Sequence, residues 1–342
     1  MLKLLQKLLI NKISKIIILI TLIIIITAIL IELYFNTFRP NYHAFDENLG
    51  WKMKTNFNFS YKQKDFYNNS YLVNFTTNEE GLRPFGNKNK EGKKILILGD
   101  SFTMDPYASN NDMWYAVLAN ELSKDKINYY GYAAGAGGYG TFQQFILLGE
   151  IKKKLTPDIF ILQFCSNDYM NNHYDWERTE GAMGQYIRRP YFKINDTLVK
   201  KKNIFYSIIN TKKISELKIV NILIFQLSNL NHKIFNKKKD LEKINTFKNH
   251  ANLITLELLK RIRSIYPDTK AYIINCDSND EKSEIFKNLV LKSNFILIPT
   301  GEKMKQYKLK KEKIFYEDGS HYNTLGNKLL GLEIYNQFQK IN

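Results

Sequence analysis

The stretch KKILILGDSFTMD, residues 93–105, runs from two lysines through an apolar segment into Gly99-Asp100-Ser101. Such a segment predicts a buried strand that ends at a turn, and four similar segments follow it along the chain. The five predicted strands cover residues 94–99, 127–133, 158–164, 271–276 and 294–299. Because the strands are apolar on both faces, they predict a parallel sheet that is covered by helices on both sides.

Helical patterns alternate with these strands. They cover residues 112–123, 141–155, 251–266, 283–292 and 323–341. We therefore predict a three-layer α/β domain over residues 93–342, preceded by a linker and a small β-rich segment at 37–92. An insertion at about 170–250 interrupts the alternation. Within it, residues 188–202 are typical of a hairpin that turns at Asn195-Asp196, and residues 214–235 of an amphipathic helix.

The first 36 residues predict a membrane anchor. Residues 16–31 carry no charge, and about 20 apolar helical residues span the ~30 Å hydrocarbon core of a bilayer. The lysines that precede this run are Lys3, Lys7, Lys12 and Lys15, whereas the first acidic residue is Glu32. The positive-inside rule therefore predicts a single-pass protein of the cytoplasmic membrane, with a cytoplasmic N-terminus and the α/β domain in the periplasm or extracytoplasmic space. A cleaved signal peptide is the alternative, but no small-x-small cleavage site follows the apolar run.

The formal net charge of +17 raises the question of a nucleic-acid partner. The lysines are spread along the chain, however, and no aromatic-basic recognition motif accompanies them. A solvated, lysine-rich surface is the simpler interpretation, so we expect no nucleic-acid partner.

The two cysteines, Cys165 and Cys276, both end apolar strand-like runs. A disulfide is possible in an extracytoplasmic compartment, but two unpaired core cysteines are the expectation that we favour. Two cysteines and five histidines without zinc-type spacing predict no metal site.

Ser101 follows a predicted strand and precedes a helix, where free N–H groups face outward. Taken alone, the tripeptide is explained as a turn that Asp100 or Ser101 caps. A nucleophilic serine needs a base, and that base needs an orienting acid. His321 lies three residues after Asp318 in YEDGSHYN, residues 316–323, just before the last helix. We expect Asp318 to hold the ring tautomer and His321 to accept the proton of Ser101. Taken alone, however, this segment is better explained as an ordinary polar turn that caps the last helix.

Acyl transfer also needs donors for a developing oxyanion. The glycine-rich stretch AAGAGGYGTFQQ, residues 133–144, follows the second strand and contains Gly138. Asn167, in SND at 166–168, follows the third strand and offers a side-chain amide, with an Asx-turn as the simpler alternative. These groups all follow carboxyl ends of strands, where parallel sheets bind ligands.

In this order, the motifs resemble the SGNH/GDSL hydrolase superfamily. The matching blocks are GDS at 99–101, GGYGTFQQ at 137–144, SND at 166–168 and DGSH at 318–321. The resemblance implies a flavodoxin-like sheet of about five strands and the catalytic residues Ser101, Asp318 and His321. It also implies that the Ser101 N–H, Gly138 and Asn167 hold the oxyanion, without cofactor or metal. The segments FDENLGWKMKTN (45–56) and RPYFKINDTLV (189–199) are similar to those of membrane-tethered bacterial members.

Two positions depart from the family pattern. Phe102 stands in place of the usual Leu, and Cys165 stands where a glycine is common. We expect a membrane-anchored serine esterase that acts on an acylated carbohydrate, a lipid or a small ester. An O-acyltransferase or deacetylase of cell-surface polysaccharide is the alternative, and a non-catalytic envelope scaffold is the third reading. The sequence does not specify the substrate or the oligomeric state.

Overall fold

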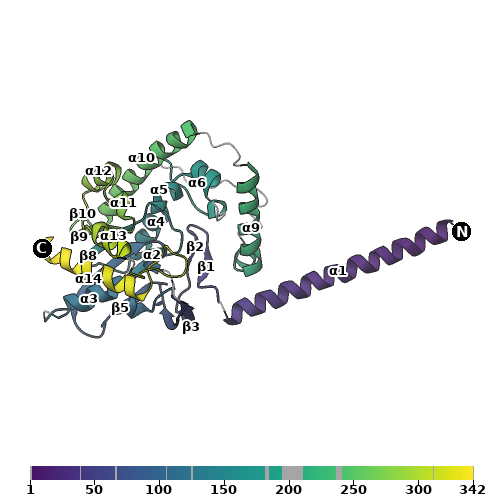
Figure 1. Ribbon diagram of the computed structural model, residues 1–342, viewed down its shortest axis with the longest axis horizontal. Helices are drawn as coiled ribbons and strands as arrows, with labels where there is room; N and C mark the ends of the chain where they lie inside the picture. Colours follow the sequence, from purple (N-terminus) through teal and green to yellow (C-terminus); the bar gives the residue numbers. More distant parts are fainter. Residues whose placement is uncertain are drawn as a thin grey trace.

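The computed structural model describes residues 2–38, 40–65, 68–104, 106–124, 126–181, 185–194, 211–235, 241–310 and 312–341. Helix α1 (Leu2–Phe38) projects away from the rest of the chain (Figure 1). Its stretch Lys12–Phe38 is long and apolar enough to cross a membrane, and none of it is buried against the protein. This helix is the membrane-span candidate that the sequence predicts.

A mostly parallel sheet forms the centre of the fold. Its parallel strands are β6 (Gly92–Gly99), β7 (Asn128–Gly135), β8 (Ile159–Phe164), β9 (Lys270–Asn275) and β10 (Ile296–Leu297). The spatial order is β10-β9-β8-β6-β7-β5, so the parallel strands, counted along the chain, lie in the flavodoxin-like order 2-1-3-4-5. All six residues of β8 are buried. The predicted fold class and the five predicted strands are confirmed.

A sixth strand, β5 (Arg83–Gly86), joins the sheet edge antiparallel to β7. It belongs to the segment 37–92, which we predicted to be a linker and a small β-rich segment that precedes the α/β domain. Four residues that include Pro84 give a weak strand signal, and a proline is tolerated there because the strand lies at an edge. Two hairpins precede it: β1 (His43–Asp46) pairs with β2 (Gly50–Met53), and β3 (Asn58–Lys64) pairs with β4 (Ser70–Thr76).

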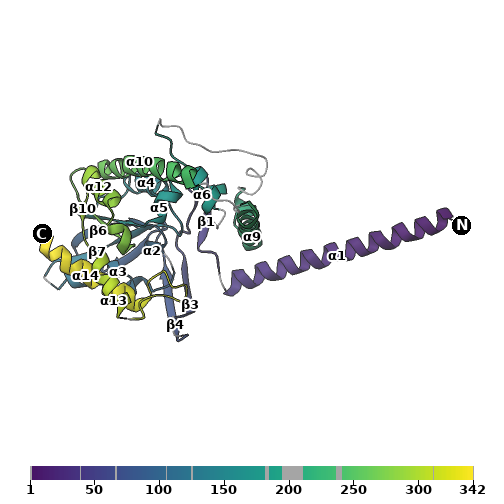
Figure 2. The same ribbon diagram turned by 45° about the horizontal axis from the view of Figure 1, so that its top comes forward.

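Helices cover both faces of the sheet (Figure 2). Helix α3 (Trp114–Leu122) packs against α14 (Thr324–Ile341) on one face, whereas α10 (Leu241–Ile265) packs against α4 (Thr141–Ile151) and α12 (Glu284–Ser293) on the other. Helix α10 begins ten residues before the predicted helix at 251–266. Its first turns are polar and contact α6 (Tyr174–Glu180), so their apolar periodicity is weak.

The remaining elements are short helices and the insertion. They are α2 (Ser101–Met104), η1 (Asn110–Asp112), α5 (Asn167–Asn171), η2 (Gln185–Ile187), α8 (Lys212–Ser215), α9 (Lys218–Phe235), α11 (Ser278–Glu281) and α13 (Gly301–Leu309). Helix α9 corresponds to the amphipathic helix predicted at 214–235. The hairpin predicted at 188–202 is not seen where the structure describes it, because residues 188–194 form no strand, and its turn at Asn195-Asp196 lies outside the described residues.

Cys165 and Cys276 form a disulfide, so the expectation of two unpaired cysteines is wrong. Phe164 at the end of β8 is in register with Asn275 at the end of β9, and the two cysteines are the next residues along each strand. Their Cα atoms lie 5.2 Å apart, within the range of disulfides. The pairing depends on the register of two strands that are 111 residues apart in the chain, which composition and spacing do not reveal.

Removing this disulfide in a Cys165→Ala/Cys276→Ala variant should lower the free energy of unfolding by about 2–4 kcal/mol, because the bridge restricts a long loop in the unfolded chain. Urea denaturation of the full chain in detergent micelles, followed by circular dichroism, measures the change. Equal stability of the variant and the wild-type protein would contradict this expectation.

Candidate active site

Ser101 lies at the carboxyl end of β6, as the first residue of helix α2. The Asp100 carboxylate accepts a hydrogen bond from the Phe102 N–H at 3.0 Å, which shapes the turn between strand and helix. Gly99 allows this turn, because a Cβ atom there would lie 2.2 Å from the Thr103 hydroxyl oxygen. Strands β6 and β8 flank the point where the strand order reverses, which is where open α/β sheets bind ligands.

Ser101, His321 and Asp318 form a continuous chain of hydrogen bonds. The His321 Nε2 atom lies 2.9 Å from the Ser101 Oγ atom, and the His321 Nδ1 atom lies 2.5 Å from the Asp318 Oδ2 atom. Because a carboxylate can only accept, the Nδ1 atom of a neutral ring carries the proton. The lone pair of Nε2 therefore faces the Ser101 hydroxyl, as removal of its proton requires.

The loop before α14 holds Asp318 and His321 together. The Asp318 Oδ1 atom accepts hydrogen bonds from the Ser320 and His321 N–H groups at 2.8 and 3.0 Å. Gly319, the residue after Asp318, has φ +72°. Burial alone would raise the pKa of Asp318, but the hydrogen bonds from Ser320 and His321 outweigh it and hold this pKa below its usual 3.8. Asp318 is therefore ionised at neutral pH.

Aromatic rings surround the imidazole. The Phe102 ring lies 4.7 Å and the Tyr107 ring 5.1 Å from the His321 ring, measured between centroids. Tyr107 in turn stacks on Tyr316 at 4.2 Å. Phe102, at the position where the family resemblance leads one to expect Leu, thus packs a ring beside the imidazole. Tyr107 was not identified from the sequence, where it is one of 22 tyrosines.

Asn167 lies at the same edge of the sheet and is hydrogen-bonded to Asp100. Its side-chain amide donates to the Asp100 Oδ2 atom at 3.1 Å, and Asp100 itself is buried. An amide nitrogen carries two hydrogens, so this bond uses only one of them. The bond orients the Asn167 side chain toward the turn that carries Ser101.

Gly138 lies in the loop that connects β7 to α4, beside the turn after β6, because Gly99 and Gly135 are in register. Its φ is +72°, and a Cβ atom there would lie 2.3 Å from the Gln185 side chain. The loop is tied to strand β2, since the Trp51 indole N–H donates to the Gly137 carbonyl at 3.1 Å. The positive φ therefore favours glycine at 138.

A buried arginine joins this loop to the insertion. Arg189 makes two bonds to the Glu177 carboxylate, at 2.7 and 3.0 Å, and a third to the Gln185 Oε1 atom at 2.9 Å. It also donates to the Gln143 Oε1 atom in the first turn of α4, and Gln143 donates to the Leu49 carbonyl at 2.7 Å. Sequence reasoning missed Arg189, because nothing local distinguishes it from the adjacent Arg188.

Asp168, next to Asn167, is fully buried. Burial and then the negative charge of Asp100 raise its pKa well above the usual 3.8. The folded chain therefore holds a proton that the unfolded chain releases, so the stability contributed by Asp168 is present below pH 3.8 and is lost as the pH rises through the folded pKa.

We expect an Asp168→Asn variant to gain stability relative to the wild-type protein as the pH rises from about 4 to about 7. The uncharged amide has no proton to lose over this range. Urea denaturation of both proteins at several pH values measures the difference, and a difference that does not change with pH would contradict the expectation.

The other histidines contribute no group to this hydrogen-bonded chain in the part of the molecule that the structure describes. The His173 Nε2 atom lies 3.1 Å from the His250 Nδ1 atom, between α6 and α10. Among the described residues, no cluster of three or more His, Cys, Asp or Glu side chains is placed to hold a metal ion.

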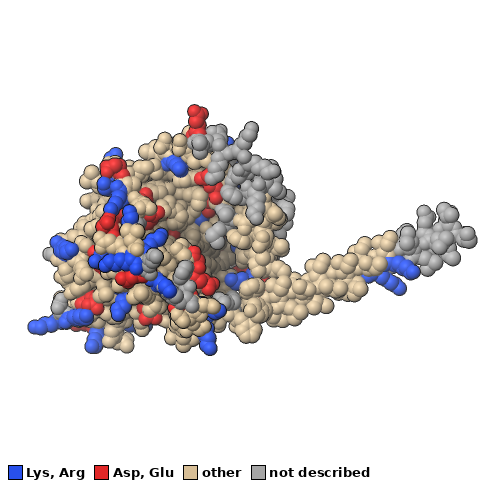
Figure 3. All heavy atoms as spheres, viewed as in Figure 1, with Lys and Arg blue, Asp and Glu red and all other residues tan. Residues whose placement is uncertain are grey.

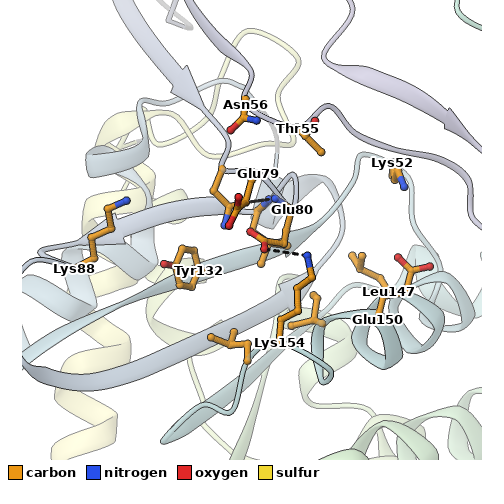
Figure 4. Close-up of a pocket in the computed structure, with 14 residues that line it drawn as sticks. Lys52, Thr55, Asn56, Glu79, Glu80, Lys88, Tyr132, Leu147, Glu150 and Lys154 are labelled. Carbon is orange, nitrogen blue, oxygen red and sulfur yellow. Dashed lines mark hydrogen bonds and ion pairs between the residues drawn. The ribbon is translucent and has the colours of Figure 1, made fainter.

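Of the cavities beside the segment that precedes the sheet, two border helix α4 or the glycine-rich loop. The larger, of about 620 Å³, lies between the turn at Glu79-Glu80 and helix α4, where Lys154 pairs with Glu80 at 3.3 Å (Figure 4). The second, of about 370 Å³, lies between the glycine-rich loop and helix α9 and is lined by Trp51, Gly137 and Phe225. Neither is lined by Ser101 or His321.

No curated protein sequence matches the chain. A crystal structure of TesA has 10% sequence identity and a TM-score of 0.43, covering 73% of this chain and 100% of that one. A lipase/acylhydrolase from Enterococcus faecalis has 14% sequence identity and a TM-score of 0.40, covering 73% of this chain and 96% of that one. A family 3 carbohydrate esterase from Clostridium thermocellum has 11% sequence identity and a TM-score of 0.40, covering 73% of this chain and 97% of that one.

These three structures are at most 14% identical to the chain. The decisive match is to a family model, described as GDSL-like lipase/acylhydrolase, which covers residues 95–334. The matched range begins in β6 and ends in α14, and so includes Ser101, Asn167, Asp318 and His321. The chain belongs to the GDSL-like lipase/acylhydrolase family and is an SGNH-type hydrolase.

Proposed function

We propose that this chain is a membrane-anchored serine esterase that cleaves acyl esters by a Ser-His-Asp mechanism on the outer side of the cytoplasmic membrane. The observation that carries the proposal is the hydrogen-bonded chain from Ser101 through His321 to Asp318. Within a family of acylhydrolases, that geometry supports nucleophilic attack by Ser101.

In the first step, the Ser101 oxygen attacks the ester carbonyl carbon while the His321 Nε2 atom takes the hydroxyl proton. The ionised Asp318 stabilises the imidazolium that forms. His321 then gives the proton to the departing alcohol, which leaves an acyl group on Ser101. Water, deprotonated by His321, attacks this acyl group, and the acid is released.

The developing oxyanion would be held by the Ser101 N–H, the Gly138 N–H and the Asn167 amide. Ser101 supplies an N–H at the start of α2, and the positive φ of Gly138 is a conformation that exposes backbone N–H groups to ligands. Asn167 would contribute the hydrogen that its bond to Asp100 leaves over. Each such donor is worth roughly 10²–10³ in rate in serine hydrolases.

The proposed location depends on α1. The lysines before the apolar span favour a cytoplasmic N-terminus, which would place the hydrolase domain outside the cytoplasm. The Cys165–Cys276 disulfide supports this side, because disulfides persist in oxidising compartments and are rare in the cytosol.

A fluorophosphonate probe tests the function, since it reacts with activated serines. We expect it to label the full-length protein in detergent micelles at Ser101. The rate of p-nitrophenyl acetate hydrolysis should depend on pH in the same way as the rate of this labelling. A folded protein that neither reacts with the probe nor hydrolyses esters would refute the proposal. If acetyl groups are transferred to an added polysaccharide faster than to water, the O-acyltransferase alternative replaces the esterase.

A further inference from the structure

Helix α9 presents a stripe of leucines to solvent. Leu223, Leu227 and Leu230 follow the i, i+4, i+7 spacing of one helix face, and their exposed fractions are 54%, 63% and 54%. Long apolar side chains aligned in this way are normally covered by a partner. The proposed esterase chemistry makes no use of this face.

The opposite side of α9 is already engaged. Asn221, Ile222 and Phe225 line the 370 Å³ cavity, together with Trp51 and Gly137 of the body of the protein. At 3.6 residues per turn, these positions lie roughly half a turn away from the leucine stripe. The Arg188 guanidinium donates to the Asn221 Oδ1 atom at 2.6 Å, so the inner face of the helix is bonded to the rest of the protein while the leucines point outward.

The first turn of α9 is bonded to the membrane-anchor candidate. The Glu32 carboxylate of α1 accepts hydrogen bonds from the Lys218 N–H at 3.2 Å and the Ile219 N–H at 3.3 Å. A carboxylate at a helix N-terminus satisfies two free N–H groups and interacts favourably with the helix dipole. Glu32, the one acid in this helix, follows the uncharged run 16–31 directly, so the bond fixes the start of α9 at the level where that run ends.

The directions of the two helices agree with this position. In Figures 1 and 2, α9 lies beside the base of α1 and runs across the direction of α1, not along it. If α1 crosses a bilayer, α9 lies in the plane of its surface. In Figure 3, the visible surface of α9 and the adjoining part of α1 is largely uncharged.

The charge of the surrounding sequence favours a lipid surface over a second protein. Residues 211–240 contain seven lysines and two acidic residues, Glu216 and Asp240. An amphipathic helix with an apolar face and basic surroundings is typical of segments that bind the interface of anionic membranes.

We propose that α9 lies in the lipid–water interface of the membrane that α1 crosses, with Leu223, Leu227 and Leu230 inserted among the acyl chains. The inference rests on the anchoring part of the proposed function and is independent of the catalytic chemistry. One wall of the cavity beside the glycine-rich loop would then lie at the bilayer surface.

Site-specific fluorescence quenching of the full-length chain tests this position. Both native cysteines are in the disulfide, so an added cysteine is the only thiol to label. The labelled variants are Leu227→Cys on α9, Ile24→Cys in the anchor as the lipid control, and Leu291→Cys on α12 as the aqueous control. Leu291 is 78% exposed, on a helix at the far side of the body from α1 (Figure 1).

The labelled proteins are reconstituted into vesicles of phosphatidylcholine and phosphatidylglycerol. We expect a nitroxide-labelled lipid to quench positions 227 and 24 several-fold more than 291, and iodide in the buffer to quench 291 several-fold more than the other two. A Glu32→Ala substitution in the 227-labelled protein should reduce the lipid quenching, because it removes both bonds to the first turn of α9, whereas Glu32→Gln keeps an acceptor and should retain most of it.

Three results would overturn the proposal. If position 24 is quenched by lipid while 227 behaves as 291 does, the anchor is in the membrane but α9 is not. If 227 is shielded from iodide yet not quenched by lipid, a protein surface covers the leucines. Absence of lipid quenching at both 24 and 227 would refute anchoring itself, whatever the esterase assay shows.

Discussion

Replacing Ser101 with alanine should lower kcat for ester hydrolysis by a factor on the order of 10⁶, as removal of the nucleophile does in serine hydrolases. Without the Oγ atom no acyl-enzyme can form, so the covalent route to hydrolysis is lost. We expect fluorophosphonate labelling to disappear in the same variant. The residual rate is measured with a chromogenic ester in detergent micelles.

The fold should survive this substitution, because the Ser101 side chain is only partly buried and its described bond is to His321. A His321→Ala variant should lose a comparable factor, and the double variant little more, because groups that act as a unit are not additive. Ser264→Ala, at an exposed serine on α10, is the matched control and should retain full activity. If folded Ser101→Ala protein keeps a substantial part of the wild-type rate, Ser101 is not the nucleophile.

Replacing Arg189 with alanine should lower the free energy of unfolding by about 3–5 kcal/mol. The substitution leaves the buried Glu177 carboxylate without its two guanidinium bonds, and the remaining bond, from the Tyr191 hydroxyl at 2.6 Å, does not neutralise the charge. It also removes the guanidinium bonds to Gln143, which accepts from the Gly140 N–H, and to Gln185, whose side chain lies beside Gly138. Chemical denaturation of the full chain in micelles measures the loss.

The kcat of the folded fraction of the Arg189→Ala protein then shows whether Arg189 also positions the glycine-rich loop, apart from its effect on stability. If Gly138 is an oxyanion donor as proposed, its displacement should reduce kcat by up to about 10²-fold. Arg178→Ala, an exposed arginine in α6, is the matched control and should change stability by less than about 0.5 kcal/mol. In an Arg189→Met/Glu177→Gln double variant no uncompensated charge remains, so part of the stability should return. If Arg189→Ala is as stable as the Arg178 control, the ion pair does not hold the loop.

Local sequence patterns predicted much of the fold. Strands β6 to β9 are apolar on both faces and α14 is amphipathic, so each could be located from its own residues. Strand β5 could not, because its pairing with β7 comes from the tertiary fold and not from its four residues. The short helix α5 after β8 was missed for a similar reason, since five residues carry no periodicity.

The candidate site divides in the same way. Ser101, Asp318 and His321 were selected because their motifs stand at strand and helix boundaries, and the structure brings these three side chains together; their catalytic roles stay a proposal. For Asn167 the motif predicted a free amide donor, whereas the structure bonds one of its hydrogens to Asp100.

The sequence by itself determined the alternation of strands and helices, the apolar anchor candidate and the motif residues, because each is written in the spacing of neighbouring residues. Only the tertiary structure decided that Cys165 meets Cys276, that Arg189 is buried against Glu177, and that Glu32 caps helix α9. Two of these contacts join segments more than 100 residues apart, and the third forms within the insertion. Such contacts depend on strand register and on how segments dock, which become fixed only when the core packs.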